Sequence, residues 1–153
     1  MPSADSPSPR SDPRYPFLES RERFDDFLAR WEAGRLTRPE WTHAAHVAVA
    51  AGYVLRYRDK ATDELRRGIR RHNAAVGTLD TATSGYHETL TGFWSGVVAR
   101  RVQGETDPWV AATRAVETFG ESRDLHRLYY SFDVVKDTRA RASFVPPDLV
   151  GPY

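Results

Sequence analysis

The chain contains no cysteine and only one methionine. The absence of cysteine excludes disulfides, thiolate metal sites, a cysteine nucleophile and iron–sulfur clusters bound by cysteine. The net charge is also small. The 22 basic residues nearly balance the 21 acidic residues, and the formal net charge is +1. A nearly neutral chain carries no strong field for nucleic acid or anionic lipid, so we expect neither as a partner.

Long apolar runs are absent as well. The longest one, residues 44–55, has 12 residues and includes His46 and Gly52, which fits a buried helix better than a membrane span. The first residues lack the apolar stretch that is typical of a signal peptide. We therefore expect a soluble, cytoplasmic protein without a membrane partner.

A chain of 153 residues suits one domain and can bury a core without a disulfide or a structural metal. Residues 1–14 hold four prolines and four serines, and such a segment cannot bury enough apolar surface to offset the cost of ordering. We expect residues 1–14 to form a disordered tail and residues 15–153 to form a single helical domain.

Apolar residues recur at helical spacing through most of this domain. The pattern predicts helices at about 20–33, 37–58, 61–73, 85–102 and 107–119, another around 124–132 and a short one around 138–143. Thr37 and Glu40 match a capping box for the second helix, and Thr83 or Ser84 is expected to cap the fourth. The sequence predicts an all-α fold, a single-domain bundle of five to seven helices, with the second helix at its centre because it is apolar all round.

Four of the five histidines fall between residues 43 and 87. His43 and His46 are three residues apart and share one face of the second helix. His72 and His87 each share a face with apolar residues of their own helices, so we expect all four imidazoles to point inward and to converge. We expect His126 to be exposed or to cap a helix.

Convergent imidazoles can bind a transition metal, act as a general base near pH 7, or only satisfy a buried helix carbonyl. Our first hypothesis is a small metalloenzyme in which His43, His46 and His87 bind one divalent metal, such as Zn, Fe, Cu or Ni. Glu88 and His87 are the candidate catalytic residues, with Glu88 as a fourth ligand, a partner of a ligand or a general base. The reaction, hydrolytic or oxidative, stays open at this point.

A small organic substrate is expected to bind in an apolar pocket lined by Tyr53, Tyr86, Trp94 and His72. Two alternatives stay open. The same pocket could serve a metal-free enzyme or ligand-binding protein, or the chain could be a non-enzymatic helical interaction module with structural histidines. The oligomeric state is open too, since four tryptophans and seven phenylalanines could fill one core or leave a patch for a homodimer.

The C-terminal stretch LYYSFDVVKDTRARASFV combines Tyr129, Tyr130 and Asp133 with Arg139 and Arg141. Tyrosine and arginine together can hold a carboxylate. We favour the simpler interpretation, in which an Arg–Asp pair and a belt of tyrosines close the end of the bundle, and the role of the cluster stays open at this point.

Three stretches also carry a resemblance: EWTHAAHVAVAAGYVLR, LRRGIRRHNAAVGTLDTATSGYHETLTGFW and YYSFDVVKDTRARASFVPPDL. Together they resemble a family of small uncharacterised bacterial proteins that have a Trp-Thr-His-x-x-His helix and a Thr-Ser-Gly-Tyr-His-Glu-Thr turn. The resemblance covers about residues 24–149. It implies a helical fold and places His43, His46, His87 and Glu88 in a shared signature, but it implies no particular activity.

Overall fold

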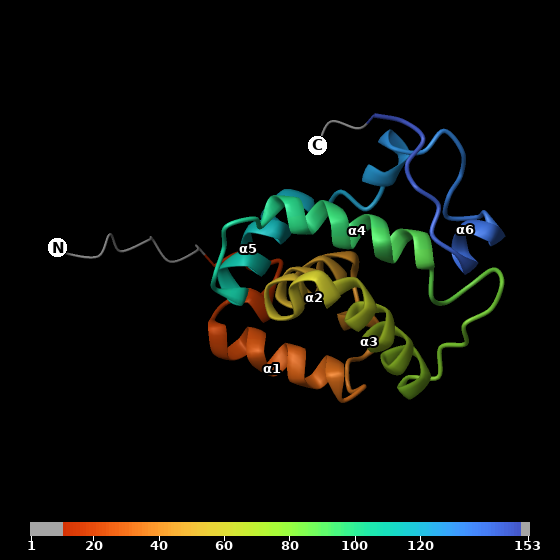
Figure 1. Cartoon of the computed structure of the whole chain (residues 1–153). Coiled ribbons are helices and arrows are strands. Elements are labelled where there is room, and N and C mark those ends of the chain that lie inside the picture. Colours follow the sequence, from red (N-terminus) through yellow and green to blue (C-terminus); the bar gives the residue numbers. More distant parts are fainter. Residues whose placement is uncertain (1–10, 151–153) are drawn as a thin grey trace.

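The computed structural model describes residues 11–150, which form helices joined by turns and contain no strand. The α-helices are α1 (Arg21–Glu32), α2 (His43–Tyr57), α3 (Ala61–Ala75), α4 (Glu88–Arg101), α5 (Pro108–Phe119) and α6 (Thr138–Ala142) (Figure 1). The predicted all-α, single-domain fold is confirmed. The predicted disordered tail, residues 1–14, lies for the most part outside the described residues.

Helix α2 lies at the centre of the bundle, as its composition predicts. It packs against α3, α4 and α5 (Figure 1), and all of its residues from Val47 to Tyr53 are buried. The many alanines bring the neighbouring backbones close, so that Ala45, Ala48 and Ala51 are fully buried. Such a helix derives its stability from burial on every side rather than from one apolar face.

Glycines allow α1 to pack closely on its neighbours. Trp31 of α1 is fully buried, and a Cβ added to Gly68 of α3 would lie 2.4 Å from its Cη2 atom. A Cβ on Gly52 of α2 would likewise meet Phe24 at 3.3 Å. The indole ring of Trp31 therefore occupies the space that a side chain at position 68 would need.

The start of the second helix differs from the prediction. Residues Arg38–Glu40 form a separate 3-10 turn, Trp41 leaves helical geometry at ψ 63°, and α2 begins only at His43. The predicted capping pair, Thr37 and Glu40, is present but caps this 3-10 turn and not α2, since the Thr37 amide donates to Glu40 Oε1 at 3.0 Å. Thr42 caps α2 instead, because its side chain accepts from the Ala45 amide at 3.2 Å. His43 and His46 therefore lie in the first turn of the helix.

The fourth helix also begins later than predicted. Thr83 and Ser84 belong to a turn, and Gly85 has a φ of +81° and approaches the Leu79 carbonyl so closely that a Cβ would lie 2.5 Å from its oxygen. His87 is the N-cap residue, and its Nδ1 accepts a hydrogen bond from the Leu90 amide at 3.1 Å. The helix cannot extend back through a left-handed glycine.

The predicted helix at 124–132 is reduced to the 3-10 turn Leu125–Leu128, whereas α6 matches the predicted short helix. The segment after α5 packs against α4, and residues 123–136 line a pocket together with the N-terminal end of α2. No helix between residues 11 and 150 combines the length and the hydrophobicity that crossing a bilayer requires.

Candidate functional site

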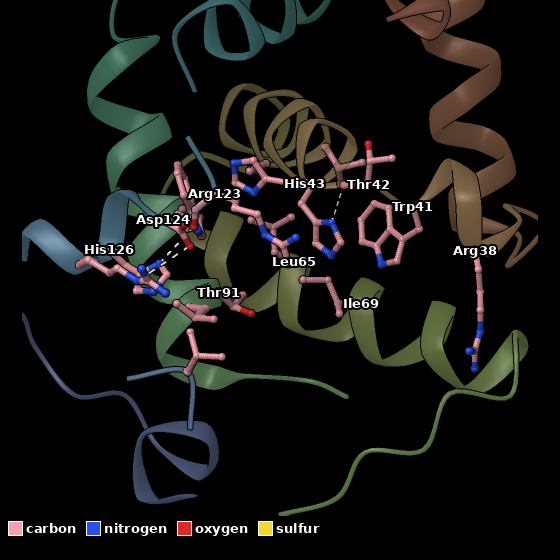
Figure 2. A pocket seen from close by; sticks show the side chains of 18 of the residues that line it. Arg38, Trp41, Thr42, His43, Leu65, Ile69, Thr91, Arg123, Asp124 and His126 are labelled. Atoms are coloured by element: carbon pink, nitrogen blue, oxygen red, sulfur yellow. Dashed lines mark hydrogen bonds and ion pairs between the residues drawn. The ribbon is translucent and has the colours of Figure 1, made fainter. Parts of the chain in front are cut away.

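A pocket of about 900 Å³ opens between the start of α2, the inner faces of α3 and α4, and the segment 123–136 (Figure 2). Its apolar wall includes Val49, Leu65, Ile69 and Leu90. Its polar wall carries His43, His46 and His126. A concave, mostly apolar site with a few polar groups has the character of a binding pocket for a small molecule.

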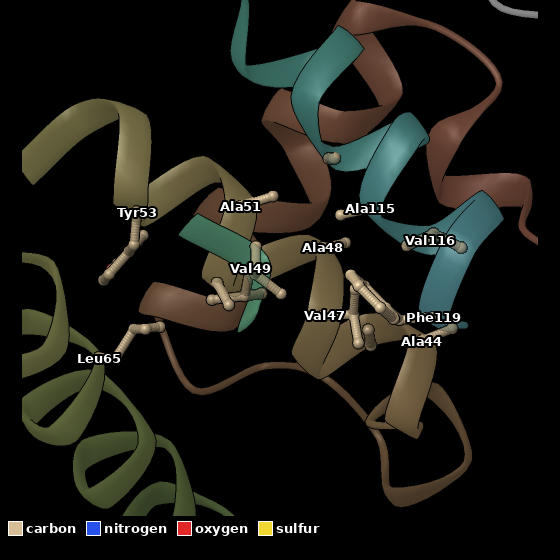
Figure 3. Packing of buried hydrophobic residues seen from close by; sticks show 14 of the residues in the cluster. Ala44, Val47, Ala48, Val49, Ala51, Tyr53, Leu65, Ala115, Val116 and Phe119 are labelled. Atoms are coloured by element: carbon tan, nitrogen blue, oxygen red, sulfur yellow. The ribbon is translucent and has the colours of Figure 1, made fainter. Parts of the chain in front are cut away.

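His43 is fixed by the end of another helix. Its Nε2 lies 3.0 Å from the carbonyl oxygen of Phe119, the last residue of α5. A carbonyl can only accept, so Nε2 carries the proton and Nδ1 holds a lone pair. Phe119 is held among the buried side chains of α2 and α5 (Figure 3), which fixes the position of its carbonyl. Burial lowers the pKa of His43, while the Phe119 carbonyl acts in the opposite direction.

His46 is fixed on two sides. Its Nδ1 donates to the carbonyl of Thr42 at 2.7 Å, and its ring stacks on Trp41 with 3.6 Å between centroids. Burial lowers its pKa to about 4, so the ring is neutral at pH 7. The bond from Nδ1 to Thr42 leaves Nε2 as the acceptor of this imidazole.

The third pocket histidine, His126, is buried rather than exposed, with 6% of its surface accessible. Its Nδ1 lies 3.1 Å from the carbonyl of Arg123, so it also closes the turn in which it lies. Figure 2 shows His126 with Arg123 and Asp124 at one end of the pocket, and Trp41 with Arg38 at the other. Sequence reasoning missed His126 and Trp41 because neither shares a helical face with the predicted site residues.

All five histidines share one feature, which is a ring nitrogen within hydrogen-bond distance of a backbone carbonyl. For His72 the partner is Trp31, at 3.3 Å across the contact between α3 and α1. His72 is 1% exposed. Its ring stacks on that of Trp31 and lies tilted against that of Trp41. It points inward as predicted, but it is not among the residues that line the pocket.

His87 does not join His43 and His46. Its Nε2 lies 2.8 Å from the carbonyl of Val134, and its Nδ1 accepts from the Leu90 amide. Both ring nitrogens are therefore engaged, and the side chain ties the start of α4 to the C-terminal segment. These bonds would have to break before His87 could bind a metal or transfer a proton.

Glu88 faces Arg66 of α3 rather than the pocket. Arg66 Nε lies 3.0 Å from both Glu88 carboxylate oxygens, and the Tyr86 hydroxyl donates to the same carboxylate. The guanidinium lowers the pKa of Glu88, and burial raises the pKa of Tyr86 to about 12. The Tyr-His-Glu sequence thus joins α3, α4 and the C-terminal segment through three adjacent side chains.

The predicted substrate pocket is only partly assembled. Trp94 lines the pocket and contacts the His43 ring edge-on at 4.7 Å. Tyr53 instead donates to Glu32 of α1 at 2.9 Å, whereas Tyr86 donates to Glu88, two residues away at the start of α4. Neither tyrosine is a lining residue. Their inward helical faces were predicted, but the partners that they meet were not.

In the described part of the chain, no three histidine or acidic side chains lie close enough together to hold a metal ion. The set His43, His46 and His87 therefore stays a prediction from sequence, and the contacts of His87 do not support it. The C-terminal cluster is also arranged differently from the expected Arg–Asp pair. Arg141 donates to the Gly85 carbonyl at 2.8 Å, while Asp133 lines the pocket.

A second hollow of about 800 Å³ adjoins the first and is lined in part by Tyr15, Phe17 and Phe27. The two hollows share Pro39, Thr42 and His43. The His43 side chain therefore borders both, and its bond to Phe119 keeps it there.

Comparison of the chain with protein-family models, with curated proteins and with solved structures finds no match. The site must therefore be interpreted from its own geometry.

Proposed function

We propose that the protein binds a small organic molecule in the pocket between α2, α4 and the segment 123–136. The observation that carries the proposal is the pairing of an apolar wall with His43 and His46, two imidazoles held in place by backbone carbonyls. Each has one nitrogen fixed as a donor to the protein. The second nitrogen of each ring is then an acceptor for a hydroxyl or N–H group of the ligand.

The two imidazoles differ in what they can do. His46 has a pKa of about 4 and stays a neutral acceptor near pH 7. His43 bonds a carbonyl at the C-terminal end of α5, where a positive charge is favoured. If the bound molecule reacts, His43 is accordingly the better general base, with Nδ1 taking the proton and Nε2 keeping its bond to Phe119.

A screen of small aromatic and aliphatic compounds by thermal shift tests the proposal, with each hit confirmed by calorimetry. Hits should raise the melting temperature of the full-length chain and bind at least tenfold more weakly to Trp94→Ala, because an aromatic wall of the pocket is lost. Phe144→Ala is the control, since Phe144 is an exposed aromatic residue outside the pocket. Equal losses in both variants, or no hit at all, would contradict the proposal.

A metal-dependent form of this function is a second candidate. It is favoured by the way a backbone carbonyl fixes one nitrogen of His43 and one of His46, which is how ligating histidines are commonly oriented. The divalent metals named above would then need further ligands from water or from the bound molecule. Metal analysis of tag-free protein tests this, together with His46→Gln. A metal-dependent site should lose its metal, whereas a metal-free pocket should keep its stability and change only in ligand affinity.

A further inference from the structure

The rim of the pocket carries an excess of positive charge. Four cationic side chains line it, Arg38, Arg123, Arg127 and Lys136, against the two carboxylates Asp124 and Asp133. The rim alone thus carries a formal charge of +2, while the whole chain carries +1. The excess is local and does not reflect the composition of the chain.

Three of these cations have no acidic partner in the part of the chain that the structure describes. Arg127 Nε lies 4.0 Å from Asp124, but within residues 11–150 no carboxylate lies within ion-pair distance of Arg38, Arg123 or Lys136. Many other arginines are paired, as Arg21 is with Asp107 and Arg30 is with Glu40. The unpaired charges at the rim are therefore free to meet an anion from solution.

The interior offers no charge of its own. His46 is neutral, and the wall behind it is formed by Val49, Leu65 and Ile69. Trp41 and Trp94 add flat aromatic surfaces, and Trp41 already stacks on the His46 ring. Burying an unpaired charge there would be costly, whereas a planar apolar group would be favoured. An anionic group of a ligand would have to stay at the rim.

We propose that the ligand is an amphipathic carboxylate, with a planar apolar body inside the pocket and its carboxylate at the rim, where Arg38, Arg123 and Lys136 supply the positive charge. This rests on the proposed binding function and adds the chemical class of the ligand. A monoanion suits the rim better than a dianion does, because Asp124 and Asp133 lie on the same rim and repel additional negative charge. Figure 2 shows Arg38 and Arg123 at opposite ends of the pocket, so an arginine is present at each end to pair with the carboxylate.

Calorimetry on the full-length chain tests the proposal with two matched probes, 1-naphthaleneacetate and its neutral amide, 1-naphthaleneacetamide. The acetate should bind about tenfold more tightly at low salt, because exposed ion pairs add modest energies. The preference should shrink at high salt, because the rim charges are exposed and screened. It should also disappear in the triple variant Arg38→Gln, Arg123→Gln, Lys136→Gln.

The control is the triple variant Arg35→Gln, Arg58→Gln, Arg71→Gln, which removes the same charge from exposed residues that do not line the pocket. It should keep the preference for the acetate. Equal affinity for both probes would overturn the carboxylate proposal and leave the binding function standing. Binding of neither probe would overturn both, and loss of the preference in the control as well would overturn the assignment to the rim.

Discussion

At the scale of single residues, the histidines of this protein act first as hydrogen-bond donors to backbone carbonyls. A carbonyl oxygen has two lone pairs, so a carbonyl at a helix end can accept from an imidazole as well as from a backbone amide. The Phe119 carbonyl at the end of α5 accepts from the Ser122 amide and from His43, and the Trp31 carbonyl in the last turn of α1 accepts from the Gly34 amide and from His72. His43, His46 and His126 combine this role with a place in the pocket wall, and this combination distinguishes them from His72 and His87.

His87 offers a test of the structural role. His87→Ala should lower the free energy of unfolding by about 2–3 kcal/mol, because the Leu90 amide loses its cap and the Val134 carbonyl loses its donor. His87→Asn should lose less, since Asn can still cap the helix but is too short to reach Val134. Urea denaturation of the two variants measures both values. Unchanged stability in His87→Ala would contradict the structural role.

Sequence could predict the inward direction of most histidines but not their partners. Helical spacing places His72 and His87 on apolar faces, and both are buried. Convergence depends on where the helices begin and how they are rotated, and α4 begins later than its pattern suggests. Because His87 is the residue before α4 rather than one inside it, its ring meets the Val134 carbonyl and the Leu90 amide.

At the scale of elements, the bundle follows from its apolar pattern, while the ends of the helices follow from local turns. The capping pair Thr37 and Glu40 is present, but a 3-10 turn and the non-helical Trp41 separate it from α2. A capping signature shows where a helical turn starts and not how far it continues. The Leu125–Leu128 turn is a similar case, because its apolar residues repeat at helical spacing but only a short turn forms.

Two glycines test the packing of the helices. Gly68→Ala should destabilise the protein by about 1–3 kcal/mol, because the new Cβ would lie 2.4 Å from the rigid Trp31 ring. Gly96→Ala on α4 should instead stabilise it by up to about 1 kcal/mol, since no atom lies within 4 Å of the added Cβ and alanine favours the helix. Thermal or urea denaturation compares the pair. A gain in stability for Gly68→Ala would contradict the close contact between α1 and α3.

At the scale of the whole molecule, the five buried or half-buried histidines should make the fold sensitive to acid. Burial lowers the pKa of each of them in the folded state. The unfolded chain takes up protons below about pH 6.5, where the folded chain resists them, so stability falls as the pH falls. Protonation of His43 and His46 should therefore affect both the stability of the fold and the pocket that these residues line.

The expected size of this effect can be stated for His46. With a folded pKa of about 4, it alone should remove about 2 kcal/mol between pH 7 and pH 5. Urea denaturation across this range measures the loss, and His46→Gln should reduce it. The lowered pKa values of Glu40 and Glu88 confine their titration to more acidic solutions, so they should not disturb this window. Stability that is constant from pH 7 to pH 5 would contradict the neutral, buried state of the histidines.

The central claim is that the pocket beside His43 and His46 is a ligand site, and the four tryptophans allow the most direct test of it. Trp41 and Trp94 line the pocket, whereas Trp109 does not line it and donates to the Leu18 carbonyl. In a protein labelled with ¹⁵N at the indole nitrogens, titration with 1-naphthaleneacetate should shift the signals of Trp41 and Trp94 and leave that of Trp109 unchanged. Equal shifts in all signals, or a shift confined to Trp109, would contradict the account.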